Sequence, residues 1–319
     1  GEDAIYNFDY DNLNGRYPSI TDTTNYQSAE IITNFNGLEP RISLRYMLNE
    51  YASIKASYYR TYQYLHLISY TTSPTPQDYW IASGPYIKPE IGNQFTLGYF
   101  KNSKNNMYEF SLEGYYKPMK NTIDYIEGAE IVLNESLEAG LAQGDGLAYG
   151  IEMQVKKKAG KLSGWISYTY SRSLRRFTEA KGALEPINNG EYYPSIHDQP
   201  NNLSLVANLK TGKRSALSVN LSYSTGRPIT IPISKFSYGP FLSALSFSER
   251  NEYRIPDFHR LDISWNIKDK NLKNKRFMGE WILSVYNVYG RKNAYAIYFD
   301  KYGNANKLSI LGSVFPSIS

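Results

Sequence analysis

Apolar and polar residues alternate with a period of two over most of the chain, from residue 38 onward. Ile42, Leu44 and Tyr46 share one parity, and Ser43 and Arg45 share the other. Successive side chains of a β-strand point to opposite faces, so this period predicts strands with one apolar and one polar face. We expect about eleven strands, near residues 41–48, 52–59, 92–101, 107–117, 147–157, 162–172, 200–210, 217–224, 257–268, 278–289 and 307–317.

The links between these strands alternate in length. Short polar turns are expected at 49–50, 102–106, 159–161 and 211–214, and long links near 62–90, 127–146, 174–199 and 225–256. A soluble sandwich or propeller has strands of about 5–6 residues and no reason for such alternation. An outer-membrane barrel has tight turns at one rim and large loops at the other. We therefore predict an all-β fold, an antiparallel transmembrane β-barrel.

Charged residues occur in the middle of several expected strands, with the parity of the polar face. Near the bilayer midplane, an Arg or Lys on the lipid side costs about 2–4 kcal/mol, so these side chains should face a wet barrel lumen. A solvated or cross-paired role is the alternative for each of them. The residues that we expect to face the lumen are Arg45, Lys55, Glu113, Glu152 and Arg260.

The composition is compatible with a membrane interface and equally with an extracellular glycan binder. The chain has 31 tyrosines, 13 phenylalanines, 4 tryptophans and a mean hydropathy of −0.50. Tyrosine suits a surface that is half apolar and half wet. No run approaches the roughly 18 apolar residues of a spanning helix. The net charge of +5 is spread along the chain, so we expect no nucleic-acid partner.

No catalytic or metal-binding pattern is present. The chain has no cysteine, and His66, His197 and His259 lack any metal-ligand spacing. The segment 9–15 fails as an EF-hand loop because Leu13 takes the third ligand position. We therefore expect no enzyme activity, no metal and no cofactor.

Aromatic residues in the long links are the candidate ligand contacts. Rings in extracellular loops can stack on sugars or planar chelates. They can equally pack the loops or belong to the aromatic belt at the membrane surface. The candidates are Tyr79, Trp80, Tyr86, Tyr192, Tyr193, Tyr238 and Phe241.

Four runs resemble the barrel of TonB-dependent outer-membrane receptors, and their order along the chain adds to the likeness. They lie at 38–46, 54–61, 162–171 and 286–295, and they include the phrases SYTYS (167–171) and YNVYGRKN (286–293). The likeness is greatest to receptors that carry a carboxypeptidase-regulatory-like domain ahead of the plug. It extends over most of residues 38–319.

The resemblance implies a 22-strand barrel around an N-terminal plug, of which this chain would supply the C-terminal half. Residues 1–37 would be an entry segment and residues 38–319 the barrel strands with their extracellular loops. We find no plug domain, TonB-binding segment or signal sequence here. The terminal aromatic strand end of such barrels is also missing at residue 319.

The function implied by the resemblance is TonB-dependent uptake, across the bacterial outer membrane, of a bulky nutrient such as an iron chelate, cobalamin or an oligosaccharide. Implied partners are outer-membrane lipid and lipopolysaccharide, the remaining barrel and plug, the inner-membrane TonB complex and, in some receptors, a surface lipoprotein. Two other readings stay open. The chain could form a passive pore of about twelve strands, or a soluble, Tyr-rich, glycan-binding β-protein.

Overall fold

The computed structural model describes residues 4–14, 17–27, 30–69, 78–126, 129, 137–179, 186–238, 242–269, 279–300 and 304–319. Nearly all regular structure in these segments is β. Two short 3₁₀ helices, η1 (Leu137–Gly140) and η2 (Ile187–Gly190), complete it. No helix among the described residues is long and apolar enough to cross a membrane.

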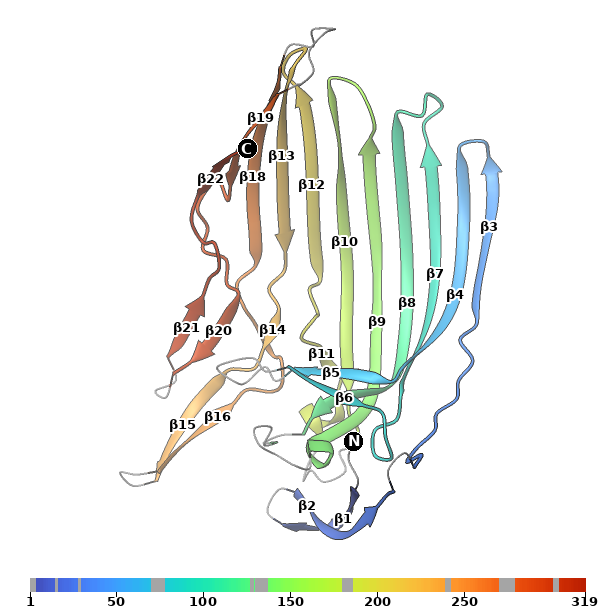
Figure 1. The fold of residues 1–319 in the computed structure, drawn as a ribbon, viewed down its shortest axis with the longest axis vertical. Coiled ribbons are helices and arrows are strands. Elements are labelled where there is room, and N and C mark those ends of the chain that lie inside the picture. The colour runs from blue at the N-terminus through green and yellow to red at the C-terminus, as the bar shows by residue number, and fades with distance from the viewer. Residues whose placement is uncertain are drawn as a thin grey trace.

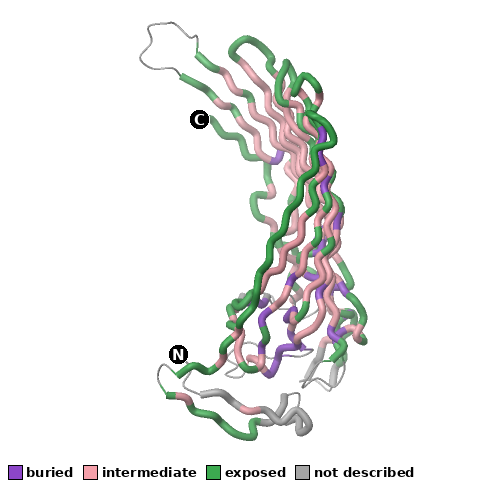
Figure 2. The backbone as a smooth tube through the Cα atoms, turned by 90° about the vertical axis from the view of Figure 1, so that its right-hand side faces the viewer, coloured by how far each residue is buried: buried purple, intermediate pink, exposed green. Residues whose placement is uncertain are grey.

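One antiparallel sheet dominates the molecule (Figure 1). Its main strands follow one another as a meander, and chain neighbours pair in space. They are β3 (Arg41–Asn49), β4 (Ala52–Gln63), β7 (Glu90–Asn102), β8 (Tyr108–Tyr125), β9 (Leu141–Lys157), β10 (Leu162–Arg176), β12 (Asn201–Lys210), β13 (Ser215–Ser224), β18 (Phe258–Lys268), β19 (Glu280–Tyr286) and β22 (Phe315–Ile318). The sheet is curved and open between β3 and β22, as a segment of a barrel wall would be (Figure 2).

The two ends of the sheet differ. Short links between strands gather at the upper end in Figure 1, which we call the turn end. The longer links 64–89, 126–140, 177–200 and 225–257 gather at the lower end, which we call the loop end. This confirms the predicted alternation of short and long links.

Most of the smaller elements belong to the loop end. They are the hairpins β1–β2 (Ala4–Asn14, Tyr17–Asn25), β5–β6 (Leu65–Ser69, Asp78–Ala82) and β15–β16 (Pro232–Tyr238, Leu242–Phe247), the pair β14 (Pro228–Ile229) with β17 (Tyr253–Arg254), and β11 (Tyr193–Pro194) beside β10. A further hairpin, β20–β21 (Ala296–Phe299, Ala305–Leu308), lies in the link from β19 to β22.

Strand register gives the main sheet two chemically different faces. Leu44 pairs with Ala56 and Ala56 with Leu97, and this row continues through Gly114 to Ile151. Directly paired residues lie on the same face of a sheet. Leu44 is 70% exposed and Leu97 62% exposed. An exposed leucine row on a long sheet has the character of a lipid-facing surface.

The buried core lies among the loops rather than against the sheet. Its members come from the links around β5, the end of β8 and the links that follow β8 and β10. They include Ile68, Ile87, Ile123, Tyr125, Ile126, Phe177, Ile187 and Tyr193. Among the described residues, the buried apolar cluster lies at the loop end, and many apolar side chains of the main sheet are exposed.

Two strand predictions near the C-terminus are corrected by the structure. The expected strand 307–317 is divided into β21 and β22, and 309–314 is irregular. The expected strand 278–289 ends at Tyr286. Asn287 has φ 53° and its side-chain amide donates to the carbonyl oxygens of Leu311 and Ser313. These bonds hold the 309–314 backbone against Asn287 instead of in a sheet ladder.

Strand β8 runs past its predicted end at residue 117. Pro118, which has no N–H to donate to a ladder, lies opposite Leu147 within the β8–β9 pair. Asn121, at φ 58°, then forms a bulge, and the ladder resumes from Thr122 opposite Gly144. The extension carries Asp124 and Tyr125 out into the loop end.

Candidate ligand-entry site at the loop end

Asp124, at the extended end of β8, lies at the centre of one buried ion-pair cluster. Its carboxylate is 3.0 Å from Arg250 Nη1 and 3.6 Å from Arg175 Nη1. The hydroxyl of Tyr193 donates to it at 2.7 Å. Burial and the neighbouring Asp124 carboxylate raise the pKa of Tyr193, so its phenol stays protonated and remains a donor. Three separate parts of the chain therefore meet at one carboxylate.

A second buried carboxylate, Asp198, lies just before β12 and binds residues of β10 and β17. Its side chain is fully buried and pairs with Arg172 at 3.2 Å and with Arg254. It also accepts the backbone N–H of Ser173 at 2.6 Å. Arg254 in turn donates to the carbonyl oxygen of Gly226 at 3.0 Å. The link 225–257 is thus fixed to β10 through Asp198.

Direct hydrogen bonds join the links 177–200 and 225–257. The Asn188 amide donates to the carbonyl oxygen of Arg250 at 3.0 Å, and the Arg250 N–H donates back to Asn188 Oδ1 at 2.8 Å. Asn188 has φ 48°, a conformation that asparagine tolerates better than most residues. The Asn251 amide donates to the Pro194 carbonyl oxygen at 2.9 Å. We call the set Asp124, Asp198, Arg250 and Arg254 the loop clamp.

The predicted ligand-contact rings have different surroundings. Trp80 is 65% exposed on β6, and Tyr192 is 41% exposed just before β11. The Arg176 guanidinium lies 4.6 Å from the centre of the Tyr192 ring. Tyr79 and Tyr86 pack against the loop core, and the Tyr86 hydroxyl donates to Asn7 at 3.1 Å.

The ligand role is not supported for Tyr193. Its ring is 2% exposed, it packs beside Phe177, and its hydroxyl is occupied by Asp124. It therefore serves the loop clamp. The side chain of Tyr238, on β15, and the whole of Phe241 lie outside the described residues.

The predicted lumen residues share one face of the sheet, opposite that of the leucine row. Arg45 lies directly across from Lys55, and Glu113 lies directly across from Glu152. Arg260 has the same parity, stacks 4.3 Å from the Tyr286 ring centre, and pairs with Asp262 at 2.9 Å. Arg45, Lys55, Glu113 and Glu152 lie in one row across neighbouring strands. Arg260 lies several strands away on the same face.

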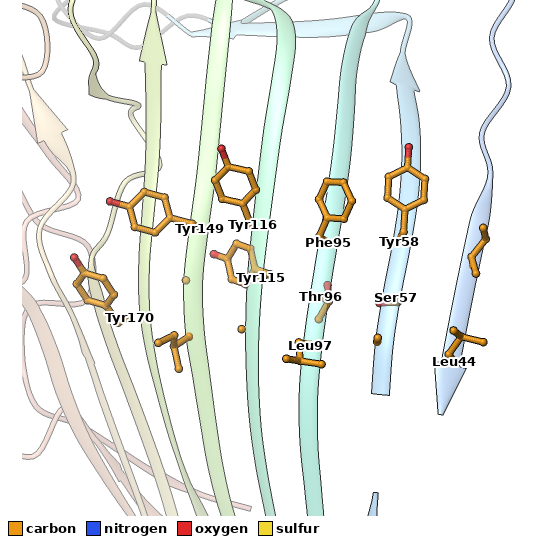
Figure 3. A pocket seen from close by; sticks show the side chains of 15 residues that line it. Leu44, Ser57, Tyr58, Phe95, Thr96, Leu97, Tyr115, Tyr116, Tyr149 and Tyr170 are labelled. Atoms are coloured by element: carbon orange, nitrogen blue, oxygen red, sulfur yellow. The ribbon is translucent and has the colours of Figure 1, made fainter. Parts of the chain in front are cut away.

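An aromatic row follows the apolar face on the loop-end side of the leucines (Figure 3). With the leucines it lines a shallow hollow of about 830 Å³, and its rings are Tyr58, Phe95, Tyr116 and Tyr149. Tyr170, which also lines the hollow, pairs with Ile151 in the leucine row. The Tyr58 hydroxyl donates to Asn93 at 3.0 Å, toward the loop end. Such rings, apolar at the body and wet at the tip, are typical of the interface belt of membrane barrels.

Sequence reasoning missed the residues of the loop clamp. Arg250 and Asp124 are 126 positions apart, and neither follows a recognisable motif. The YNVYGRKN run (286–293) holds the end of β19 to the start of β18. The Asn287 N–H donates to Asp262, Tyr289 reaches His259 at 2.8 Å, and Arg291 donates to the Asp257 carbonyl oxygen at 2.9 Å.

No described residues form a group of three or more His, Asp or Glu suited to a metal ion. His66 is buried, with its Nε2 3.0 Å from Ser83 Oγ. The site geometry supports binding by packed loops.

Comparison with known proteins agrees with this geometry. The family model described as TonB dependent receptor-like, beta-barrel matches residues 7–288. Among solved structures, the chain is similar to the ferric-catecholate import receptor Fiu of Escherichia coli K12, with a TM-score of 0.54 and 13% identity over 94% of this chain and 35% of that one. No match was found among curated protein sequences.

Two further structures show the same fold. The pyoverdine receptor FpvA of Pseudomonas aeruginosa gives a TM-score of 0.53 with 14% identity, covering 85% of this chain and 31% of that one. The iron transporter FrpB of Neisseria meningitidis gives 0.54 with 14% identity, covering 88% and 38%. The chain thus spans about a third of the length of these proteins.

Proteins of this family are transporters and not enzymes. With most of its residues matched, the chain belongs to the TonB-dependent receptor β-barrel family of the bacterial outer membrane.

Proposed function

We propose that this chain is part of the barrel of a receptor that takes up a bulky nutrient with energy supplied through TonB. The observation that carries the proposal is the loop end. Its long links are packed into one unit by a buried core and the loop clamp. Pre-organised loops lose less conformational entropy when they hold a ligand, which favours affinity.

The two faces of the sheet support an orientation for the proposed receptor. The leucine row and the aromatic row face lipid, and the row that contains Arg45, Lys55, Glu113 and Glu152 faces the lumen. The reverse arrangement would place several charges in hydrocarbon at about 2–4 kcal/mol for each basic side chain. The long links then lie on the extracellular side.

An iron chelate is the preferred ligand class in this proposal. Fiu imports ferric catecholates, FpvA is a pyoverdine receptor, and FrpB is an iron transporter. Trp80 and Tyr192 offer exposed rings on two separate links, and Arg176 beside Tyr192 adds a positive charge. Flat rings and a cation suit a planar, anionic chelate. Cobalamin and oligosaccharides are the alternative ligand classes, and the uptake experiment below distinguishes them from an iron chelate.

The proposed partners follow from the same family. A plug would fill the lumen, its exposed segment would contact TonB in the periplasm, and a surface lipoprotein would assist some ligands. The apolar face would contact outer-membrane lipid and lipopolysaccharide.

Uptake in the native bacterium tests the proposal. Cells lacking the gene should lose uptake of one labelled ferric chelate, and restoring the gene should recover it. Wild-type uptake should stop when TonB is removed. Uptake that persists without TonB would identify a passive pore instead, and uptake of cobalamin or an oligosaccharide alone would change the ligand class.

Binding by loop variants tests the ligand surface. Trp80→Ala combined with Tyr192→Ala should weaken binding about tenfold, because each stacking ring is worth roughly 0.5–1.5 kcal/mol beyond area burial. Tyr64→Ala is the matched control, since Tyr64 is comparably exposed beside the same hairpin but stacks on Tyr62. Equal binding by the double variant and the control would assign Trp80 and Tyr192 to loop packing.

A further inference from the structure

A hollow of about 730 Å³ opens at the turn end, between the starts of β13 and β19 and the end of β18. Its lining combines aromatic, aliphatic and basic side chains, including Trp265, Ile267, Trp281, Lys213, Arg214 and Lys268, with one carboxylate, Asp269, just after the end of β18. The strand ends that line the hollow lie at the opposite end of the sheet from the long links that carry the loop clamp (Figure 1). It plays no part in the proposed recognition of a nutrient.

The aromatic wall of the hollow belongs to the lipid-facing side of the sheet. Trp265 pairs with Leu217, and Trp281 pairs with Ile267, so all four share the face that carries the leucine row. Trp281 is 63% exposed and Trp265 is 44% exposed. Tryptophan at the end of a transmembrane strand typically marks the level of the lipid headgroups.

The basic side of the hollow is formed by the turn 211–214. Neither Lys213 nor Arg214 makes an ion pair with any other residue that the structure describes. A neighbouring turn shows the opposite arrangement, because Lys156 and Lys158 both pair with Glu109, at 3.7 and 2.6 Å. Lys268 has only a long contact, 3.9 Å, with Glu280. Lys213 and Arg214 therefore stand beside two exposed tryptophans, and with Lys268 they outnumber the Asp269 carboxylate in the same lining.

We propose that this hollow binds an anionic phospholipid of the periplasmic leaflet. The phosphodiester group accepts hydrogen bonds from Arg214 and Lys213, and the acyl chains pack on Trp265, Ile267 and Trp281. Arginine suits a phosphate because its planar guanidinium can donate two bonds at once. The proposal rests on the family's outer-membrane location and on short turns facing the periplasm. It is independent of which nutrient the receptor takes up.

Native mass spectrometry of the full-length receptor in neutral detergent provides the test. Phosphatidylglycerol and phosphatidylethanolamine are each titrated against the wild type and against the double variant Lys213→Gln, Arg214→Gln. The wild type should retain phosphatidylglycerol in preference. The double variant should lose about 30-fold in affinity, since each cation near an anionic headgroup contributes roughly fivefold. Trp281→Ala should also weaken the retention of phosphatidylglycerol, because it removes a ring that contacts the acyl chains.

The matched control is the double variant Lys156→Gln, Lys158→Gln, which removes the same charge from the same rim. Heat-dependent migration on gels verifies that each variant folds. The proposal is overturned if both double variants lose phosphatidylglycerol equally, which would indicate diffuse rim charge. It is also overturned if inorganic phosphate displaces the lipid completely, which would indicate a site for the free anion. The lipid titration does not measure nutrient uptake, so a negative result would overturn the lipid site without bearing on the proposed function.

Discussion

Replacing Asp124 by Asn should open the loop end while leaving the barrel wall intact. The substitution keeps the size of the side chain and removes its charge, so that Arg250 and Arg175 lose their shared counter-ion. The side chains of Asp124 and Arg250 are only 13% and 15% exposed. Removing one partner of a buried ion pair costs about 3–5 kcal/mol, because the other charge is left uncompensated. Asn still accepts a hydrogen bond, so we expect the lower value.

Hydrogen exchange by mass spectrometry measures the effect directly. A loss of about 3 kcal/mol in the local opening free energy speeds exchange by roughly 100-fold in the links 177–200 and 225–257. The ladder of β12 with β13 is held by its own backbone bonds and should not change. Heat-dependent gel migration of the variant should match that of the wild type.

Asp145→Asn is the control for this experiment. Asp145 also binds two cations, Lys120 at 2.7 Å and Arg176 at 2.9 Å, but Lys120 is 67% exposed. Exposed pairs contribute about 0–1 kcal/mol. Exchange that rises equally in the two variants, or in neither, would refute the idea that the loop clamp holds these links together.

Three smaller predictions concern single residues. Burial lowers the pKa of His66 below its ordinary 6.5, so the neutral form is favoured in the folded hairpin. The hairpin is therefore fully stable above pH 6.5 and loses stability as the pH falls below that value. Protease resistance of β5–β6 should be lower at pH 5 than at pH 7.5 in the wild type, and should not differ between these pH values in His66→Gln. Gly164→Ala should reduce folded yield on gels, because φ is +148° and a Cβ would lie 2.0 Å from the Val206 carbonyl oxygen; an unchanged yield would contradict this. Asn287→Ala removes the bonds that hold the β19–β22 link and should cost roughly 2–3 kcal/mol, seen as faster exchange at 309–314 and not at β9.

The sequence was sufficient to predict the main strands because each strand separates lipid from a polar surface. Leu44 and Arg45 must face opposite ways, and a two-residue period records that requirement directly. The same logic predicted that Lys55 and Glu113 share a face. The lengths of the links between these strands predicted the alternation of short turns and long loops.

The loop end could not be predicted in this way. Contacts such as Arg250 with Asp124 join residues 126 positions apart and leave no periodic trace. Tyr193 is a predicted ligand contact because it lies in a long link, but β11 turns its ring into the loop core. The strand expected at 307–317 failed because side-chain bonds from Asn287 compete with the sheet for the same backbone.

Cysteine labelling of the two sheet faces tests the account most directly. The chain has no cysteine, so each introduced thiol reports on one position. In the receptor in its membrane, cysteines at Lys55, Glu113 and Glu152 should react with small hydrophilic thiol reagents. Cysteines at Leu44, Ile54, Ile151 and Val219 should resist these reagents. A fluorophore attached to such a thiol in the unfolded protein should, after refolding into lipid, be quenched by lipid-attached quenchers. The opposite pattern would contradict the assignment of the leucine row to lipid and the charged row to the lumen.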